Sequence, residues 1–489
     1  MNTPAPAGAV APAAVAPTST STSTTITLRG ALDELAARLD GRLVIPGDAG
    51  WDEARAAWNL AVDQRPVAVV VARSAIDVAR TVDLARSLGL GVAPQATGHN
   101  AGPLVAAHGL ADVILLRTHE LRGVRIDAAA RVARVEAGAL WGDVVEAAAP
   151  HGLAPLAGSS HDVGVVGYTL GGGVSWLARS QGLAANRVLA AEVVTADGRI
   201  RRIDAEHESD LFWAIRGGGG DFAVVTALEF GLLPIAEAVA GTLFFPLERA
   251  DEVLHAWARW TRSIPDTVTS VGRVLRFPAL PELPPFLAGK SFAVVEVVLL
   301  ESAATADGLL EPLRALGPDI DTVHLQPIPE LLQLHMDPPG PTPGIGGGLA
   351  LADLPDAAVD AFLDAVGPDS GTLLVSAEIR QLGGRVRPDA ARAAAAAEGL
   401  PLPGVVAGLD AGYLVYGVGI AVPEIVEGVR ASIARLVDGL APWHAELDYL
   451  NFVEDRADAG RFFGDRLEQL RHLKRAVDPT RVIRSNHAV

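Results

Sequence analysis

The sequence predicts an α+β protein of two domains. The chain has 489 residues, of which 49% are hydrophobic and 20% charged, so it is long and apolar enough to bury two cores. Strand-like and helix-like runs alternate along it, and their character changes after Pro234. We therefore expect two successive globular units, the first of them with Gly-rich connections.

A βαβ unit is expected at the start of the first domain. Val67–Ala72 and Gly91–Ala96 are apolar strand candidates, and the amphipathic stretch Ile76–Leu88 between them predicts a helix. Further strands are expected at 112–116, 132–135, 189–195 and 222–230, and further helices at 141–149 and 210–215.

Longer strand candidates alternate with amphipathic helices after Pro234, which predicts a sheet with helices on one face. The strands are expected at 268–277, 291–300, 371–382 and 412–422, and the helices at 251–262, 357–365 and 424–440. The segment Asp337–Gly348 reads DPPGPTPGIGGG and predicts a loop, which either covers a site or connects two elements.

Composition excludes several functions. The net charge of −18 repels nucleic acid and anionic membranes, and mildly favours a neutral or cationic small-molecule substrate. The absence of Cys excludes disulfides, thiolate metal sites and a Cys nucleophile. The chain also lacks an HxxxH pair, so its histidines give little support for a metal site. No Lys or Arg precedes Arg29, and Pro interrupts the apolar runs before it, so we expect a loose tail, no secretory signal and a cytoplasmic location.

Two Gly-rich loops are candidate ligand sites. Gln95–Gly102 follows a predicted strand, and its small residues allow backbone amides to converge on an anion beside His99, although a loop histidine is often only a surface residue. Gly164–Val174 precedes a helix expected to run through Trp176 and Arg179, and it would either admit a ligand's phosphates to the main chain or form a tight turn.

Three other motifs argue against common nucleotide and hydrolase sites. Arg216–Phe222 (RGGGGDF) precedes a strand, whereas a Rossmann fingerprint must follow one. Pro284–Ser291 ends like a Walker A loop, but Pro284 replaces the first Gly and lacks its amide, so we reject an NTPase. The chain has no GxSxG elbow that would present a Ser nucleophile.

Tyrosines near the C-terminal half are candidate proton acceptors, or else sheet residues with satisfied hydroxyls. Tyr449 begins the segment Tyr-Leu-Asn-Phe, and the alternation of a strand places Tyr413 and Tyr416 on opposite faces, so only one of these two can face a ligand. Glu378 and Arg380 share a strand face, where they are either site residues or a cross-strand ion pair facing solvent.

In order and spacing, these motifs resemble the FAD-linked oxidases of the vanillyl-alcohol oxidase/p-cresol methylhydroxylase superfamily, and within it the berberine bridge enzyme-like group. The resemblance covers almost all of the chain after the tail and implies a two-domain FAD-binding fold of the p-cresol methylhydroxylase type. It divides the chain into a disordered tail (1–28), an FAD-binding domain (29–236), a substrate-binding domain with an antiparallel sheet covered by helices (237–445), and a C-terminal segment that returns to the FAD-binding domain (446–489).

The resemblance implies that His99 bonds covalently to the flavin 8α-methyl carbon. Many relatives add a second bond through a Cys, but Ser160 stands at that position, which leaves a single link. Gln95 and Thr97 replace the family's usual Arg and Gly, and Val163 follows the pattern of a small residue that leaves room for dioxygen. The residues implied to surround FAD are His99, Gln95, Ala96, Thr97, Gly98, Asn100, Ala101, Gly102, Ser160, Val163, Gly164, Gly167, Tyr168, Gly171, Gly172, Gly173, Val225, Asn451 and Asn486.

The implied activity is that of an oxidase. A base would take a proton from an O–H or N–H group while a hydride passes from the adjacent carbon to the flavin. Tyr449 is the preferred base, with Asn451 holding either the flavin or the phenol, and Tyr413 or Tyr416 is the substitute. The alternatives are a dehydrogenase with an acceptor other than dioxygen, or a non-redox cyclase or ligand-binding protein on the same fold.

Overall fold

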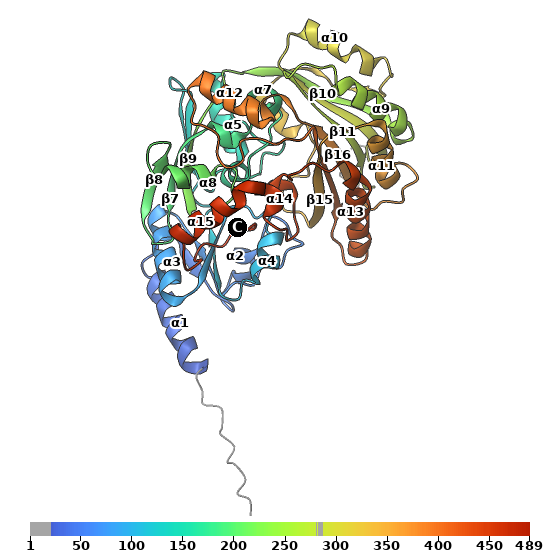
Figure 1. Ribbon diagram of the computed structural model, residues 1–489. Coiled ribbons are helices and arrows are strands. Elements are labelled where there is room, and N and C mark those ends of the chain that lie inside the picture. Colours follow the sequence, from blue (N-terminus) through green and yellow to red (C-terminus); the bar gives the residue numbers. More distant parts are fainter. Residues whose placement is uncertain (1–20, 280, 282–286) are drawn as a thin grey trace, which may run out of the picture.

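The computed structural model describes residues 21–279, 281 and 287–489 (Figure 1). Residues 1–20 of the expected tail and residues 284–286 of the Walker-like segment lie outside the described residues. Helix α1 (Ser21–Ala36) begins inside the segment predicted as tail, so that prediction was wrong for its last residues. The helix forms because Leu32 and Leu35 are buried in the first core, and its N-terminal turns extend this anchored segment.

The first part of the molecule contains two sheets. In the four-stranded sheet, of order β1-β2-β4-β3, strands β2, β4 and β3 are parallel; in the five-stranded sheet, of order β5-β6-β9-β7-β8, neighbours are antiparallel. The strands are β1 Arg42–Val44, β2 Ala68–Val71, β3 Gly91–Gln95, β4 Val113–Arg117, β5 Val124–Asp127, β6 Val132–Glu136, β7 Val188–Val194, β8 Ile200–Asp204 and β9 Val224–Gly231. The expected βαβ unit is present, with β4 between its two strands.

Helices and Gly-rich connections surround these sheets. They are α2 Trp51–Arg55, α3 Ala75–Leu88, α4 Gly102–His108, α5 Trp141–Ala148, α6 Val165–Leu170, α7 Ala178–Gln181 and α8 Ser209–Ile215. The helix expected after the loop Gly164–Val174 is present only as the short α7, which includes Arg179 but not Trp176, and a further helix that was not expected, α6, lies inside the loop. The sequence prediction erred because Val165 and Val166 bury their side chains as soon as the chain passes Gly164, so the helix begins there.

The second part is an eight-stranded antiparallel sheet, covered on one face by helices (Figure 1). Its strands are β10 Glu237–Pro246, β11 Val268–Arg276, β12 Ser291–Leu299, β13 Ile320–Asp321, β14 His324–Pro327, β15 Gly344–Leu351, β16 Ser376–Gln381 and β17 Tyr413–Ile420. The helices on this face are α9 Ala250–Thr261, α10 Ala303–Arg314, α11 Asp356–Val366 and α13 Val426–Leu440, whereas α12 Pro388–Glu398 lies beside the first part, where Glu398 pairs with Arg187. The face without helices is turned towards the first part.

Part of the predicted Pro/Gly loop is a strand. Gly344–Gly348 form the first half of β15, which pairs with β17 at the edge of the sheet. A Cβ at Gly346 would collide with the Tyr416 hydroxyl, and one at Gly348 would collide with the backbone of Val415. These glycines therefore allow the strand to pass close under Tyr416, a requirement that the sequence alone does not reveal.

The chain returns to the first part at its end, through α14 (Gly460–Phe463) and α15 (Leu467–Val477). Val92 of β3 donates to the carbonyl of Val482 and accepts from Arg484, which extends the four-stranded sheet. Lys474 is buried and its ammonium donates to the Asp478 carboxylate (2.9 Å) and the Ile483 carbonyl (3.0 Å).

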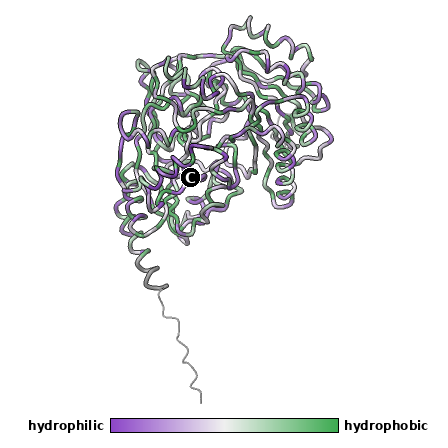
Figure 2. The backbone as a smooth tube through the Cα atoms, viewed as in Figure 1, coloured by the Kyte–Doolittle hydropathy of each residue, from purple (hydrophilic) through white to green (hydrophobic). Residues whose placement is uncertain are grey.

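Hydrophobic and hydrophilic residues alternate along the backbone throughout both parts (Figure 2). Among the described residues, no helix is both long and apolar enough to cross a membrane.

We predict that Lys474→Met destabilises the fold by about 3–5 kcal/mol, because it leaves the buried carboxylates of Asp221 and Asp478 without their cation. Chemical denaturation measures the loss. Arg475→Met is the matched control: Arg475 is largely exposed in its pair with Glu468, and its loss should change stability by less than about 0.5 kcal/mol. Equal effects of the two substitutions would contradict this anchoring role.

Candidate functional site

His99 lies in a corner built from three segments distant in sequence. Its ring stacks on Trp58, with ring centroids 4.0 Å apart and planes 16° from parallel. Its Nδ1 lies 2.8 Å from the Thr97 hydroxyl, and its Nε2 lies 3.7 Å from an oxygen of Asp162. The imidazole is thus held on both edges and one face, while about a quarter of its side chain stays exposed.

Asp162 fixes this corner. Its carboxylate accepts hydrogen bonds from the Trp58 indole (2.7 Å), the Ser160 hydroxyl (2.9 Å) and the Gly340 amide (3.3 Å). Burial opposes its ionisation, but the neighbouring His99 imidazole and the hydrogen bonds from Trp58 and Ser160 outweigh burial and lower the pKa of Asp162. The donor Gly340 belongs to the Pro/Gly loop, so this loop does cover a candidate site residue.

Two polar side chains behind the His99 loop differ from expectation. Gln95 exchanges two amide hydrogen bonds with Gln64 (2.9 and 3.1 Å), so the structure directs it into the core rather than the loop. Arg117, which the sequence reasoning missed, donates to the carbonyls of Ala56 and Ala96, and burial lowers its pKa to about 10. No described carboxylate pairs with it, so it contributes positive charge behind the loop.

At most positions of the Gly-rich segment, packing within the protein explains why the residue is a glycine. At one position it does not. A Cβ at Gly171 would collide with Asn451, and one at Gly173 would approach the ring of Tyr168 to 2.6 Å. Gly167 is different, because a Cβ there would meet nothing within 4 Å although α6 is otherwise largely buried. Gly167 is exposed, so the face of α6 is open at this position.

Tyr449 lies against this segment. Its hydroxyl oxygen accepts hydrogen bonds from the Val174 amide (3.1 Å) and the Asn451 side chain (3.0 Å), and Asn451 also donates to the carbonyl of Tyr168. Burial raises the pKa of Tyr449, and these two donors oppose the rise because they stabilise a phenolate. The predicted pair Tyr449 and Asn451 thus acts as one unit.

Tyr416 and Glu454 form a second acid–base pair. The phenol hydrogen-bonds to Glu454 Oε1, while Oε2 accepts from the Gly346 amide at 2.9 Å. Burial raises the pKa of both groups. The ring of Phe452 lies 4.8 Å from that of Tyr416 and 5.2 Å from that of Tyr449, so it joins the two phenols.

Glu454 was missed in the sequence because its partner comes from a strand of the other part. Tyr413, by contrast, is not brought to the site. It lies among the residues packed under the helices, with its hydroxyl 2.8 Å from Thr261, as the opposite-face argument allows. We therefore no longer consider it a candidate base.

A cluster of buried charges lies on the same inner face of the sheet. Arg380 bonds to Glu378 through Nε at 2.6 Å, and the imidazole of His335 lies 2.8 Å from both Glu378 and Glu296. Arg273 completes the cluster at 3.2 Å from Glu296. Of the two alternatives left open for Glu378 and Arg380, the ion pair facing solvent is wrong as to its place: the two residues do pair, but on a sheet face that the first part of the molecule covers.

The remaining predicted residues lie around these groups. Gly98 has a φ of 88°, which only glycine adopts without strain, and Val163 accepts a hydrogen bond from the Trp141 amide. Val225 is buried in the first core, and Asn486 turns its amide oxygen to the next residue's N–H. A Cβ at Gly102 would lie 2.9 Å from the Glu454 carbonyl oxygen and one at Gly172 would lie 3.4 Å from the Tyr449 ring, while Ala101 is the N-cap of α4.

On the outer helices, Asp251, His255 and Asp360 bring potential ligand atoms within 4.8 Å of one another. Both carboxylates are largely exposed, and His255 Nε2 lies 3.2 Å from Asp360, so a surface ion pair accounts for the group.

Comparison with known proteins identifies the fold and the family. A family model described as an FAD-binding domain matches residues 66–204. YvdP, an FAD-linked oxidoreductase of Bacillus subtilis, is 30% identical over 315 residues, which are 63% of this chain and 67% of that protein. The (R)-6-hydroxynicotine oxidase of Paenarthrobacter nicotinovorans is 36% identical over 194 residues, but this match spans only 40% of the chain and 42% of that enzyme.

Solved structures agree over the whole fold. The BBE-like 1 protein of Physcomitrella patens superposes with a TM-score of 0.78 at 20% identity, covering 94% of this chain and 98% of that one. Glucooligosaccharide oxidase of Acremonium strictum, with a 6-S-cysteinyl, 8α-N1-histidyl FAD, superposes with a TM-score of 0.76 at 22% identity, covering 94% and 99%. The chain belongs to the FAD-linked oxidoreductases, and it has the two-domain fold of the BBE-like protein.

The site residues fit FAD. The Asn100 amide oxygen and the Tyr168 hydroxyl are buried without a hydrogen-bond partner, and the face of α6 at Gly167 is open. The uncompensated Arg117 supplies positive charge suited to an anionic cofactor. Asn100 and Tyr168 would hold FAD between the His99 loop and Tyr449.

We predict that the buried cluster makes stability depend on pH. Burial and Arg273 oppose protonation of His335, but Glu296 and Glu378 outweigh them and raise its pKa to about 9. Because the pKa of His335 is higher in the folded state, its protonation stabilises the fold fully below about pH 6.5. This stabilisation, on the order of 3 kcal/mol, is lost as the pH rises through about 9. Denaturant unfolding across this range should show the loss in the wild type and a flatter profile in His335→Gln. Parallel profiles would contradict it.

Proposed function

We propose that this FAD-linked oxidoreductase is an oxidase whose FAD is bonded to His99 alone. Its small-molecule substrate would lose a hydride from a carbon that bears an O–H or N–H group, and dioxygen would be the electron acceptor. The observation that carries the proposal is the pair of phenols around Phe452, since Tyr449 and Tyr416 place titratable hydroxyls on both sides of one site.

The geometry around His99 supports the covalent bond. Asp162 faces Nε2, which favours the tautomer that carries its proton there and leaves the Nδ1 lone pair free to act as the nucleophile. The Thr97 hydroxyl, 2.8 Å from Nδ1, would hold the ring in place through this lone pair and release it when the bond to the flavin forms. Without any Cys in the chain, a second link through sulfur is impossible.

The geometry also supports Tyr449 as the base. Its oxygen receives two hydrogen bonds, from Val174 and Asn451, which would stabilise the phenolate, and the positive charge of Arg380 acts in the same direction. When bound, the flavin supplies the hydride acceptor, while these residues take the proton and exclude water. Dioxygen as the acceptor is supported by the oxidase relatives and by the small side chain of Val163.

We expect the acid-denatured protein to keep one FAD by intact mass, and His99→Ala to keep none, because no other side chain here is a matching nucleophile. Trp58→Phe, which removes the indole donor to Asp162 but retains an aromatic ring beneath His99, is the matched control and should keep the bond. If the wild type released all of its flavin on denaturation, the covalent link would be wrong.

We predict that Tyr449→Phe slows anaerobic flavin reduction by about 100-fold or more at saturating substrate, because the general base is lost. Stopped-flow absorbance with a panel of alcohols and amines measures the rate. Tyr413→Phe, which also removes one phenol but from the helix-covered core, should leave the rate within about twofold of the wild type. A wild-type rate in Tyr449→Phe would transfer the role to Tyr416 and Glu454. Rapid reduction without peroxide formation in air would indicate a dehydrogenase.

A further inference from the structure

The charged cluster occupies adjacent rows of the sheet's inner face. Arg273, Glu378 and Tyr416 are consecutive partners across β11, β16 and β17, and Glu296, Val271 and Arg380 form the next row across β12, β11 and β16. Directly paired residues of antiparallel strands point to the same face. The cluster is therefore continuous with the Tyr416–Glu454 pair that borders the proposed catalytic site.

His335 is an imidazolium by geometry. Its two ring nitrogens lie 2.8 Å from carboxylate oxygens of Glu296 and Glu378, and an ionised carboxylate can only accept, so both nitrogens must carry protons. With Arg273 and Arg380 there are three positive charges, against the two negative charges of Glu296 and Glu378. The buried cluster has a surplus of one positive charge.

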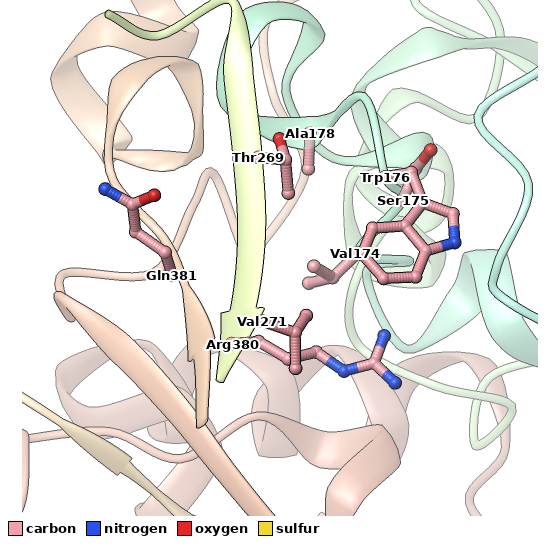
Figure 3. Close-up of a pocket in the computed structure, with 8 residues that line it drawn as sticks. All are labelled: Val174, Ser175, Trp176, Ala178, Thr269, Val271, Arg380 and Gln381. Atoms are coloured by element: carbon pink, nitrogen blue, oxygen red, sulfur yellow. The ribbon is translucent and has the colours of Figure 1, made fainter. Parts of the chain in front are cut away.

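Arg380 presents this surplus to the site. Its Nε and Nη2 atoms both donate to the Glu378 carboxylate, whereas no described residue accepts a hydrogen bond from Nη1. Its guanidinium carbon lies 5.9 Å from the ring centre of Trp176 and 5.4 Å from that of Phe452, the ring that contacts both phenols. Figure 3 shows the Arg380 guanidinium beneath Trp176, whereas the side chain of the next residue, Gln381, points away from both.

We propose that Arg380 is an anion subsite, and that the substrate carries a carboxylate or a similarly compact anion beside the group that is oxidised. The inference rests on the proposed function for the position of the reacting carbon. The acidic net charge of the chain would disfavour an anionic substrate. A local buried cation nevertheless outweighs distant surface charges, because solvent screens them. Asp337, the nearby carboxylate that acts on Arg380, is exposed and so is screened by solvent.

Other charged groups facing the cluster do not cancel the surplus. The Glu454 carboxyl accepts hydrogen bonds from the Tyr416 hydroxyl and the Gly346 amide, so both of its oxygens are engaged away from Arg380. The competing explanation is that Arg380 serves only to neutralise Glu378. In that case the site would have no preference for an anion.

The test uses benzoate and benzamide as probes, because the two have nearly the same shape and only benzoate is charged. Perturbation of the flavin absorbance of the FAD-loaded protein gives both dissociation constants at constant ionic strength. We expect benzoate to bind at least about 10-fold more tightly to the wild type, as a charge-assisted hydrogen bond should provide. Arg380→Met should reduce this ratio to about one, and Arg380→Lys should retain part of it.

Arg276→Met is the matched control. Arg276 belongs to the same sheet, but its Nη2 donates to the carbonyls of Val366 and Gly367 at the end of α11. The Arg276→Met substitution removes one positive charge without changing the site, so the preference for benzoate over benzamide should remain. If Arg276→Met also lost the preference for benzoate, that preference would come from the electrostatic field of the whole protein, and the proposal would be overturned.

The wild-type ratio decides the matter even if Arg380→Met does not fold. Equal binding of benzoate and benzamide by the flavin-loaded wild type would refute the anion subsite and leave the proposed redox function intact. A wild type that holds no flavin, measured first by its visible spectrum, would instead contradict the proposed function itself.

Discussion

The return of the C-terminal segment to the first part is the constraint on which the site depends. This segment carries Tyr449, Asn451 and Glu454 between the two parts, and it stays there because Lys474 is buried against Asp478 and near Asp221. Its last residues also extend the four-stranded sheet at β3. If that anchor were lost, Tyr449 would lose its donor Val174, and Glu454 would lose Tyr416.

The inner face of the large sheet explains why charge is buried here. A sheet covered by helices on one face and by solvent on the other would alternate apolar and polar residues, and its charges would be hydrated. Here the first part covers the second face, so Glu296, Glu378 and Arg273 are almost fully buried. Burying ions is costly unless they are paired, and replacing such pairs with apolar residues is often neutral or stabilising. Their presence agrees with the proposed anion subsite at Arg380.

Periodicity predicted the regular elements well, because their signals are local. The helix at 76–88, the opposite faces of Tyr413 and Tyr416, and most strands follow from alternation along one segment. The pairings across the chain could not be predicted in this way. The sequence around Gln95 does not indicate its hydrogen bond to Gln64. Glu454 can be recognised as a site residue only once the fold brings β15 and β17 beside it.

Glycine-rich segments were the hardest to interpret, since one residue type serves two purposes. Gly171 and Gly346 are required by Asn451 and Tyr416 of the same chain, whereas Gly167 faces open space. The sequence shows all three alike, and only the packing separates a close backbone contact from room for a cofactor.

The most direct test is a crystal structure of the oxidised, flavin-loaded protein. The interpretation predicts continuous electron density from the imidazole of His99 to the flavin, and a ring that extends past Tyr168 to lie within hydrogen-bonding or van der Waals reach of Tyr449. A flavin without a bond to His99 would contradict the covalent link, and a ring remote from both Tyr449 and the Tyr416–Glu454 pair would contradict the proposed chemistry.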